Sequence, residues 1–576
     1  MKPMFATFRQ AMAWLHTWFG LVLGFVLMAA FFFGALSVFD REFDRWAIPA
    51  TRIAPQPMPS FEAVLRPAFE RMQPTAQAVD AMRPRANGAL PERFDTIAYW
   101  SAYTTHRDPL VALFAGFEVP DAKHPGEQIY AEATIDPRDG HVLPDDRLKI
   151  GSGFFYPMHY GLTLDWKNLG IFIVGFSALV MLAALVSGVV MHRKVFREFF
   201  TFRPGKQRLR SVLDLHNLTG VVALPFHFFF ALTGLLIFAA TYYFPLGHTQ
   251  LHELHDRAAA LDAQQTGLPH ERAGVPAELA NVDAMVADAR ARWEQAGKAG
   301  DVGFLVLMHP GDANGYVSVY RAGTDRIALV GDGVHFKATT GELIREDPAP
   351  TTVGRMAEFL TGLHLQHFRH WLLRWLYVFG GLAGAVCIAT GFVFFVEKRK
   401  RQHAARGVQG ARVVDALAVA SVSGMVLAVL GILVANRLLP EDLPARGAWE
   451  QRAFWATWVL ALLHAAWRSA PVARGLPNPA WREQAWVIAV LAAVAAVLNW
   501  VTTDDHLLRT LANGYWPVAG VDLALLAVAI IAGVAARRLG VRARSLQPVP
   551  AAEHVSAIAG RTAMHQPKTA RAPRHA

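Results

Sequence analysis

The amino-acid sequence predicts a polytopic α-helical membrane protein of about eight transmembrane helices, with two extracytoplasmic α+β domains in an internal repeat. Three observations lead to this fold class. Of the 576 residues, 53% are hydrophobic, and they gather in runs close to the roughly 20 residues that a transmembrane helix needs. Two of the segments between runs are long enough for a small domain. The basic residues cluster on one side of the alternating runs.

Eight apolar runs are the predicted spans. They cover residues 12–38, 168–191, 213–240, 372–396, 413–436, 453–467, 484–502 and 517–536. The sixth run is short. The first run is followed by FDREFDRW and has no convincing small-residue cleavage site. We therefore expect it to be a retained membrane anchor rather than a signal peptide.

The excess of positive charge, +10 overall, is concentrated in clusters at 193–210, at 397–412 and from residue 537 onward. If the spans alternate in direction, all three clusters lie on the same side, and the positive-inside rule makes that side the cytoplasm. We therefore expect a bacterial inner-membrane protein with both termini in the cytoplasm. The basic charge then reflects membrane topology, and no nucleic-acid partner is expected.

The spans divide the chain into seven predicted parts. These are a first transmembrane helix (1–40), an extracytoplasmic domain (41–166), two spans with a basic cytoplasmic loop (167–240), a second extracytoplasmic domain (241–370), a fourth span (371–402), a C-terminal extension with four spans (403–540) and a disordered cytoplasmic tail (541–576). Alternating residues around Asp139-Gly140 and around Thr340-Gly341 predict one β-hairpin in each external domain.

An internal repeat relates the first four spans. WLHTWFGLVLGFVLMAAFFFGAL, from Trp14, aligns without gaps on DLHNLTGVVALPFHFFFALTGLL, from Asp214. The alignment matches His16 with His216 and Gly34 with Gly234, and SGVV at 187–190 corresponds to TGFV at 390–393. The repeating unit is a span, an external domain and a second span, used twice in parallel orientation.

These motifs resemble the PepSY-associated transmembrane proteins. The resemblance rests on MHRKVFREFFTFRPGK, the histidine-containing span after it, and the external IDPRDGHVL and TTGELI. The family includes iron-regulated inner-membrane proteins and haem-containing ferric-siderophore reductases. The resemblance covers about residues 8–402. It implies PepSY-like external domains, haem b within the first four spans, and electron transfer to ferric chelates outside the membrane.

The histidines support a haem protein independently of that resemblance. His216 and His227 are eleven residues apart, which on a continuous helix is a rise of about 16.5 Å with a return to nearly the same face. One would lie near the cytoplasmic side and the other toward the outer half, so the pair predicts two haems. Two neutral imidazole ligands give an electron-transfer centre.

Each haem then needs a second ligand at matching depth. The candidates are His16 and His192 at the inner level, and His159 and His364 at the outer level, with His367 and His370 behind. For His227 the alternative is a packed histidine bonded to a carbonyl that Pro225 leaves free. For His16 and His192 the alternative is an ordinary interfacial residue.

Other polar groups have weaker claims on a cofactor or metal. His248, His252 and His255 would line one helical face and could contact metal or iron chelate, or simply form a wet surface. Haem propionates need cations, for which the candidates are Arg193, Lys194 and Arg203 inside and Lys167, Arg369 and Arg374 outside, although snorkelling explains each of these as well. We expect His464 and His506 to be structural. The single cysteine, Cys387, excludes internal disulfides and thiolate clusters.

The expected function is that of a di-haem b reductase that carries electrons from a cytoplasmic-side donor to a ferric siderophore in the periplasm and releases ferrous iron. No catalytic residue separate from the haems is expected. A separate donor is needed because the sequence has no flavin or nicotinamide domain and no phosphate-binding glycine loop after a strand. Two alternatives stay open: a non-enzymatic membrane protein that binds a partner or inhibits a peptidase, and a transporter subunit.

Overall fold

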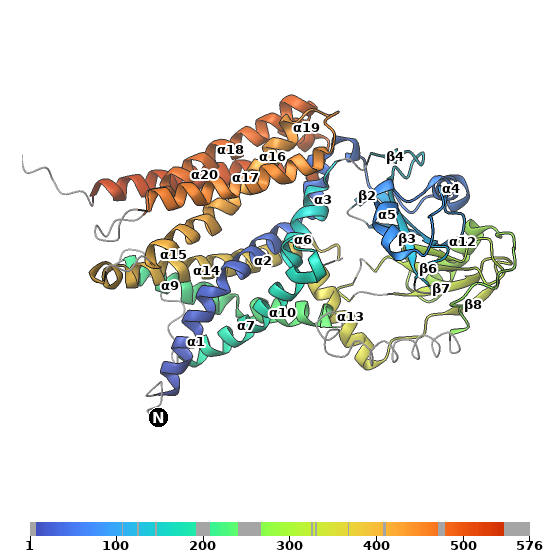
Figure 1. Ribbon diagram of the computed structural model, residues 1–576, viewed down its shortest axis with the longest axis horizontal. Helices are drawn as coiled ribbons and strands as arrows, with labels where there is room; N and C mark the ends of the chain where they lie inside the picture. The colour runs from blue at the N-terminus through green and yellow to red at the C-terminus, as the bar shows by residue number, and fades with distance from the viewer. Residues whose placement is uncertain are drawn as a thin grey trace, which may run out of the picture.

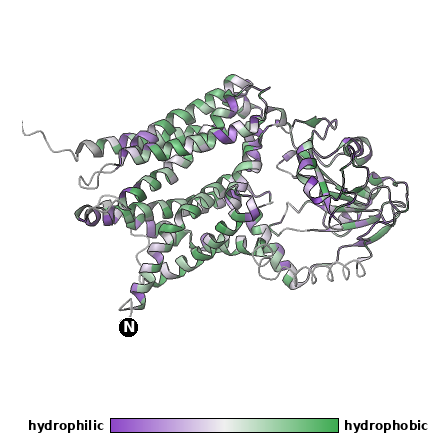
Figure 2. Ribbon diagram, viewed as in Figure 1, coloured by the Kyte–Doolittle hydropathy of each residue, from purple (hydrophilic) through white to green (hydrophobic). Residues whose placement is uncertain are grey.

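The computed structural model describes residues 7–105, 108–123, 126–144, 147–191, 208–239, 266–323, 326–328, 331–366, 368–406, 410–469 and 478–545. A bundle of long helices forms one end of the molecule, and a β-sheet with its own short helices forms the other (Figure 1). Hydrophobic residues run along the bundle helices, whereas hydrophilic residues are more frequent at helix ends and around the sheet (Figure 2). The protein is a multi-pass membrane protein.

Five to seven membrane spans follow from helix length and composition in the described residues. The five continuous spans are Trp166–Met191, which contains α7 (Leu169–Met191), Trp371–Arg399 in α14 (Trp371–Ala405), Gly410–Leu438, which contains α15 (Gly410–Val419), η6 (Ala420–Gly424) and α16 (Met425–Leu438), Ala480–Thr503, which is α18, and Trp516–Val541 in α20 (Trp516–Ser545). The predicted span at 453–467 lies in α17 (Arg446–Arg468), which does not meet these criteria and carries charged residues such as Glu450 and Arg452. The count of eight therefore stays a prediction.

The other two spans are bent helix pairs. In the first pair, α1 (Phe8–Val22) meets α2 (Gly24–Ser37) at 61°, and in the second, α9 (Arg208–Val222) meets α10 (Leu224–Ile237) at 60°. The breaks fall at Leu23 and Ala223, which occupy the same position in the predicted repeat. Pro225 contributes to the second break, since proline has no N–H to continue the helix, whereas the first pair bends equally with Phe25 at the matched position. The premise that one continuous helix carries His216 and His227 is therefore wrong.

In the described residues, the strands form one antiparallel sheet of eight strands in the order β4-β3-β2-β1-β5-β6-β7-β8. Their bounds are β1 Ile97–Thr105, β2 Asp108–Glu118, β3 Gln128–Ile135, β4 Val142–Leu143, β5 Val302–Met308, β6 Tyr316–Arg321, β7 Gly333–Lys337 and β8 Leu343–Glu346. Both predicted hairpins are confirmed, as β3–β4 and β7–β8. Gly140 and Gly341 occupy their turns at φ +73° and +76°, a conformation that favours glycine.

The two segments predicted to be external share this sheet because β1 pairs with β5. The register runs from Tyr99 opposite Met308 to Tyr103 opposite Phe304. One face of the sheet buries an apolar core with α4 (Arg66–Arg71), α5 (Ala76–Met82) and α12 (Val282–Gln295), in which Trp100 stacks on Phe69. The strands of both predicted external domains are therefore joined edge to edge.

Short elements connect the sheet to the bundle. They are α3 (Asp40–Ala47), η4 (Ile150–Phe155), α6 (Tyr156–Gly161) and α13 (Thr352–Leu365). The remaining short helices are η1 (Pro49–Thr51), η2 (Phe61–Leu65), η3 (Arg83–Arg85), η5 (Trp166–Asn168) and α19 (Leu507–Ala512). Since α6 and α13 each carry a predicted haem-ligand histidine near the sheet, these connectors build part of the site.

Candidate cofactor site

Two of the predicted histidines meet at the end of the bundle remote from the sheet. His16 on α1 and His216 on α9 have ring centroids 6.2 Å apart, with the rings nearly perpendicular at 84°. Nδ1 of His16 hydrogen-bonds the carbonyl of Ala184 on α7 at 3.0 Å, and Nδ1 of His216 hydrogen-bonds the carbonyl of Cys387 on α14 at 2.7 Å. We call these two residues the inner pair, after their predicted layer. In each repeat unit, the histidine of the first span is therefore oriented by a carbonyl of the last span of the same unit.

Two further histidines meet at the sheet side of the bundle. His159 on α6 and His364 on α13 have ring centroids 6.0 Å apart and an interplanar angle of 28°. Nδ1 of His159 donates to the carbonyl of Ala30 at 2.8 Å. Nδ1 of His364 lies 2.8 Å from the Thr233 hydroxyl oxygen, which accepts because its own proton goes to a backbone carbonyl of α10. We call these residues the outer pair.

Burial keeps the outer pair neutral. It lowers the pKa of His159, although the hydrogen bond to Ala30 acts in the opposite direction. Burial also lowers the pKa of His364, to about 3, and the neighbouring His159 adds to the effect. Neutral imidazole is the form that binds haem iron. The outer pair is therefore in the protonation state that a ligand needs.

Each of the four rings lies against a glycine of a neighbouring helix. A Cβ placed on Gly34, Gly234, Gly188 and Gly391 would lie 2.8, 3.2, 3.3 and 3.4 Å from the nearest ring atom of His159, His364, His16 and His216, respectively. Gly34 and Gly234 are matched in the repeat, and so are Gly188 and Gly391. At Gly34, Gly234 and Gly188 a Cβ would be closer to the ring than an ordinary contact, whereas at Gly391 it would just reach contact distance.

The spacing of both pairs fits a metal between the rings. Two imidazoles that bind one metal ion from opposite sides through bonds of about 2.0 Å have ring centroids roughly 6 Å apart. A histidine that ligates through Nε2 usually donates its Nδ1 proton to a carbonyl or similar acceptor, which is the arrangement found here. The donor set therefore fits haem with two histidine ligands. No group of three or more His, Cys, Asp or Glu side chains suited to a metal occurs among the described residues.

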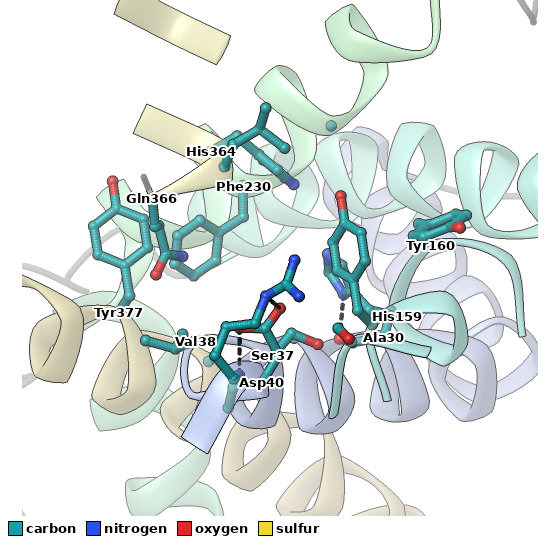
Figure 3. Close-up of a pocket in the computed structure, with 18 of the residues that line it drawn as sticks. Ala30, Ser37, Val38, Asp40, His159, Tyr160, Phe230, His364, Gln366 and Tyr377 are labelled. Carbon is teal, nitrogen blue, oxygen red and sulfur yellow. Dashed lines mark hydrogen bonds and ion pairs between the residues drawn. The ribbon is translucent and has the colours of Figure 1, made fainter. Parts of the chain in front are cut away.

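A cavity of about 620 Å³ adjoins the outer pair and reaches the sheet. Cofactor pockets typically have volumes of about 300–1,000 Å³. Toward the bundle its walls are apolar, whereas toward the sheet they carry Arg41, which pairs with Asp108, and Lys149, which donates to Thr134. Figure 3 shows His159 and His364 approaching this space from different helices, with Gln366 near Phe230 and Tyr377. The buried Oε1 of Gln366 has no hydrogen-bond partner in the described part of the chain. The cavity therefore combines an apolar interior with a polar mouth.

The sequence profile described as the PepSY-associated TM region matches residues 13–398. The chain belongs to this family. An uncharacterized protein of Pseudomonas aeruginosa, PA4219, is similar to it, with 26% identity over 382 residues, which are 62% of this chain and 86% of that protein. Both histidine pairs lie inside the matched region. The helices from α15 onward lie outside it.

One predicted ligand of this PepSY-associated protein stands apart from both pairs. His227 on α10 is 3% exposed, and its ring packs edge-on against Phe31 at 5.2 Å. Its Nε2 has no hydrogen-bond partner among the described residues. The structure thus joins the two predicted outer-level alternatives, His159 and His364, to each other and brings neither of them to His227.

The other candidates divide into four groups, and one of these, Arg369 and His370, is exposed. His192, His248, His252, His255, His367, Arg193, Lys194 and Arg203 lie outside the described residues. Of the predicted outer cations, Arg374 is committed to Glu42 and to the carbonyl of Val38, and Lys167 lies over the Trp166 ring. His464 hydrogen-bonds Glu483, and His506 caps the N-terminus of α19.

The polar mouth of the cavity in this PepSY-associated protein was not predicted from the sequence. Arg41 and Lys149 were not among the candidates, because neither lies near a predicted span end that carries a histidine. The glycines that seat the rings were visible as matched positions in the repeat, without an assigned role. Glycine has no side chain and therefore leaves room for a ring. Its recurrence at matched positions of two aligned helices was the signal that could have indicated where the histidine rings pack.

Proposed function

We propose that this protein is a di-haem b membrane reductase, which carries electrons from a cytoplasmic-side donor to a ferric siderophore in the periplasm. The observation that carries the proposal is the pairing of four histidines at two levels, with ring centroids 6.2 and 6.0 Å apart. Every one of these rings is oriented through Nδ1 and seated against a glycine. Independent packing histidines have no reason to share all three properties.

Haem b, when bound, supplies a one-electron carrier at each level. The chain itself holds the ligand rings at fixed separation and orientation. Because the Nδ1 bonds fix the tautomer, they also present Nε2 as the ligating atom. Apolar walls line the cavity beside the outer pair, and its mouth is a mixed-charge surface in which Arg41 is paired with Asp108 and Lys149 adds a second cation.

The reduction of a ferric chelate needs only electron transfer, so it does not require acid or base catalytic residues in the protein. Hard oxygen donors hold ferric iron more tightly than ferrous iron, so one electron is enough to weaken the chelate. The donor loses that electron on the cytoplasmic side, and the iron of the chelate gains it on the periplasmic side. The chelate's approach would be from the sheet side, where the cavity next to the outer pair is lined by β1, β2 and β3.

The visible spectrum of the purified protein tests this proposal. We expect reduced b-type bands and about two haems per chain, with one haem lost in His16→Ala, His216→Ala, His159→Ala or His364→Ala. Anaerobically reduced protein should then reduce a ferric siderophore, followed with a ferrous-iron trap, and His464→Ala is the matched control. A colourless but folded preparation would refute the proposal and leave partner binding by the sheet as the alternative.

A further inference from the structure

A buried polar network joins the C-terminal helices to α3. Trp46 donates its indole N–H to Oδ1 of Asp522 on α20 at 2.8 Å, and Asn499 on α18 donates to Oδ2 at 3.0 Å. Asp522 is 3% exposed, and the other two side chains are fully buried. Removing one partner from such a group leaves a buried polar atom unsatisfied, which is costly. The network therefore holds α3 against α18 and α20.

Arg52 provides a second attachment just after α3. Its guanidinium donates to Oδ1 of Asn499 at 2.8 Å, to the carboxylate of Asp505 at 2.7 Å and to the backbone carbonyl of Trp46 at 2.8 Å. One side chain thus binds the end of α3 and the loop after α18 together. An arginine is always charged and offers several donors in a fixed plane, which suits this bridging role.

The middle C-terminal helices make further contacts with the same region. Arg437 on α16 lies over the Trp46 ring at 4.8 Å and donates to the backbone carbonyl of Ala47. Phe454 on α17 is fully buried and packs on Phe33 of α2 and Phe154 of η4 at centroid distances of 6.0 and 4.9 Å. Four helices beyond the matched family region therefore converge on α2, α3 and η4.

From α3 the contacts lead to the outer histidine pair. Asp44 accepts a hydrogen bond from the backbone N–H of Gly151 at 2.7 Å and from the Ser152 hydroxyl at 2.5 Å. A Cβ on Gly151 would lie 1.8 Å from the backbone oxygen of Asp40, so η4 and α3 touch backbone to backbone. The chain then runs from η4 directly into α6, which carries His159. A shift of α3 would be transmitted to that histidine.

We infer that α16, α17, α18 and α20 act as a positioning clamp for the outer histidine pair, through Trp46 and Asp522. These residues touch neither ring, so they are positioning residues. The inference deepens the proposed di-haem function, since it assigns the unmatched C-terminal helices a part in setting the outer centre. The contacts that link these C-terminal helices to α6 through α3 and η4 do not depend on a bound cofactor.

The test uses the full chain in lipid nanodiscs with Trp46→Phe and Asp522→Asn. Trp46→Phe keeps the aromatic ring and removes one N–H donor, whereas Asp522→Asn keeps the shape and replaces an acceptor by a donor. Asp504→Asn is the matched control, because this carboxylate lies in the same C-terminal region but is exposed and pairs only with Arg509 among the described residues. Hydrogen exchange is measured by mass spectrometry over 40–47 and 150–161, with α12 as an internal reference.

We expect amide exchange in these two segments to become about tenfold faster or more in both variants, and to be unchanged in α12 and in the control. In haem-loaded protein, the midpoint potential of the outer centre should shift, whereas that of the inner centre should stay unchanged. Unchanged amide exchange in the milder variant, Trp46→Phe, would overturn the inference that these helices position the outer pair. Faster amide exchange with both midpoint potentials unchanged would overturn it as well. If the wild-type protein binds no haem, the proposed function fails while the exchange result still decides the clamp.

Discussion

Substitution of Gly34 by alanine should selectively damage the outer site. The new Cβ would lie 2.8 Å from Nδ1 of His159, and an ordinary contact begins at 3.4 Å. The ring must therefore retreat by about 0.6 Å, which exceeds the roughly 0.5 Å within which a functional constellation must be held. Overpacking of this kind costs about 1–3 kcal/mol, and it strains the hydrogen bond from His159 to Ala30.

The assay is haem content and the reduced spectrum of Gly34→Ala beside Gly20→Ala. A Cβ on Gly20 would have no atom within 4 Å. Alanine there should therefore leave both centres intact and stabilise the helix by about 0.5–1 kcal/mol. We expect Gly34→Ala to hold close to one haem per chain. Two haems with an unchanged spectrum in Gly34→Ala would refute the assignment of His159 as a ligand seated by this glycine.

Three further results are expected. The double variant of His159→Ala with His364→Ala should lose no more haem than either single variant, because both rings serve one centre, and quantitative haem extraction checks this. His227→Leu should keep both haems, since His227 packs on Phe31 rather than on another histidine, and a missing haem would restore His227 as a ligand. Asp312→Asn should lower the melting temperature of the sheet at pH 7 but much less at pH 3. Burial acts to raise the Asp312 pKa, but backbone N–H groups, including that of Gly274, and a nearby arginine hold it below its usual value. The stabilisation is therefore full above the unfolded pKa of about 3.9 and is lost as the pH falls through the lower folded value.

The sequence predicted the membrane character, the two hairpins and the four histidines that form the pairs. These features depend on local patterns: apolar runs, alternating strands around a glycine turn, and histidines placed at similar depths. The pairing of His16 with His216 was among the predicted combinations, because the repeat puts both rings at the same depth in equivalent helices.

The outer pairing could not be predicted in the same way. The depth argument for His227 needed a straight helix, and the 60° bend at Ala223 removes its basis. His159 and His364 come from short helices that return from the sheet to the bundle, and no periodic pattern indicates where such helices dock. The clamp on α3 was equally hidden, since Trp46 and Asp522 are far apart in the sequence and each looks unremarkable alone.

The pairing of β1 with β5 has a consequence for how the protein is made. The edge of β1 that β5 covers stays open until residues 302–308 have been synthesised, after two further candidate spans. An open strand edge is a template for pairing with other chains. Strand β1 therefore has an open edge during the middle of translation, and a chain interrupted between the two halves of the sheet would be prone to aggregation.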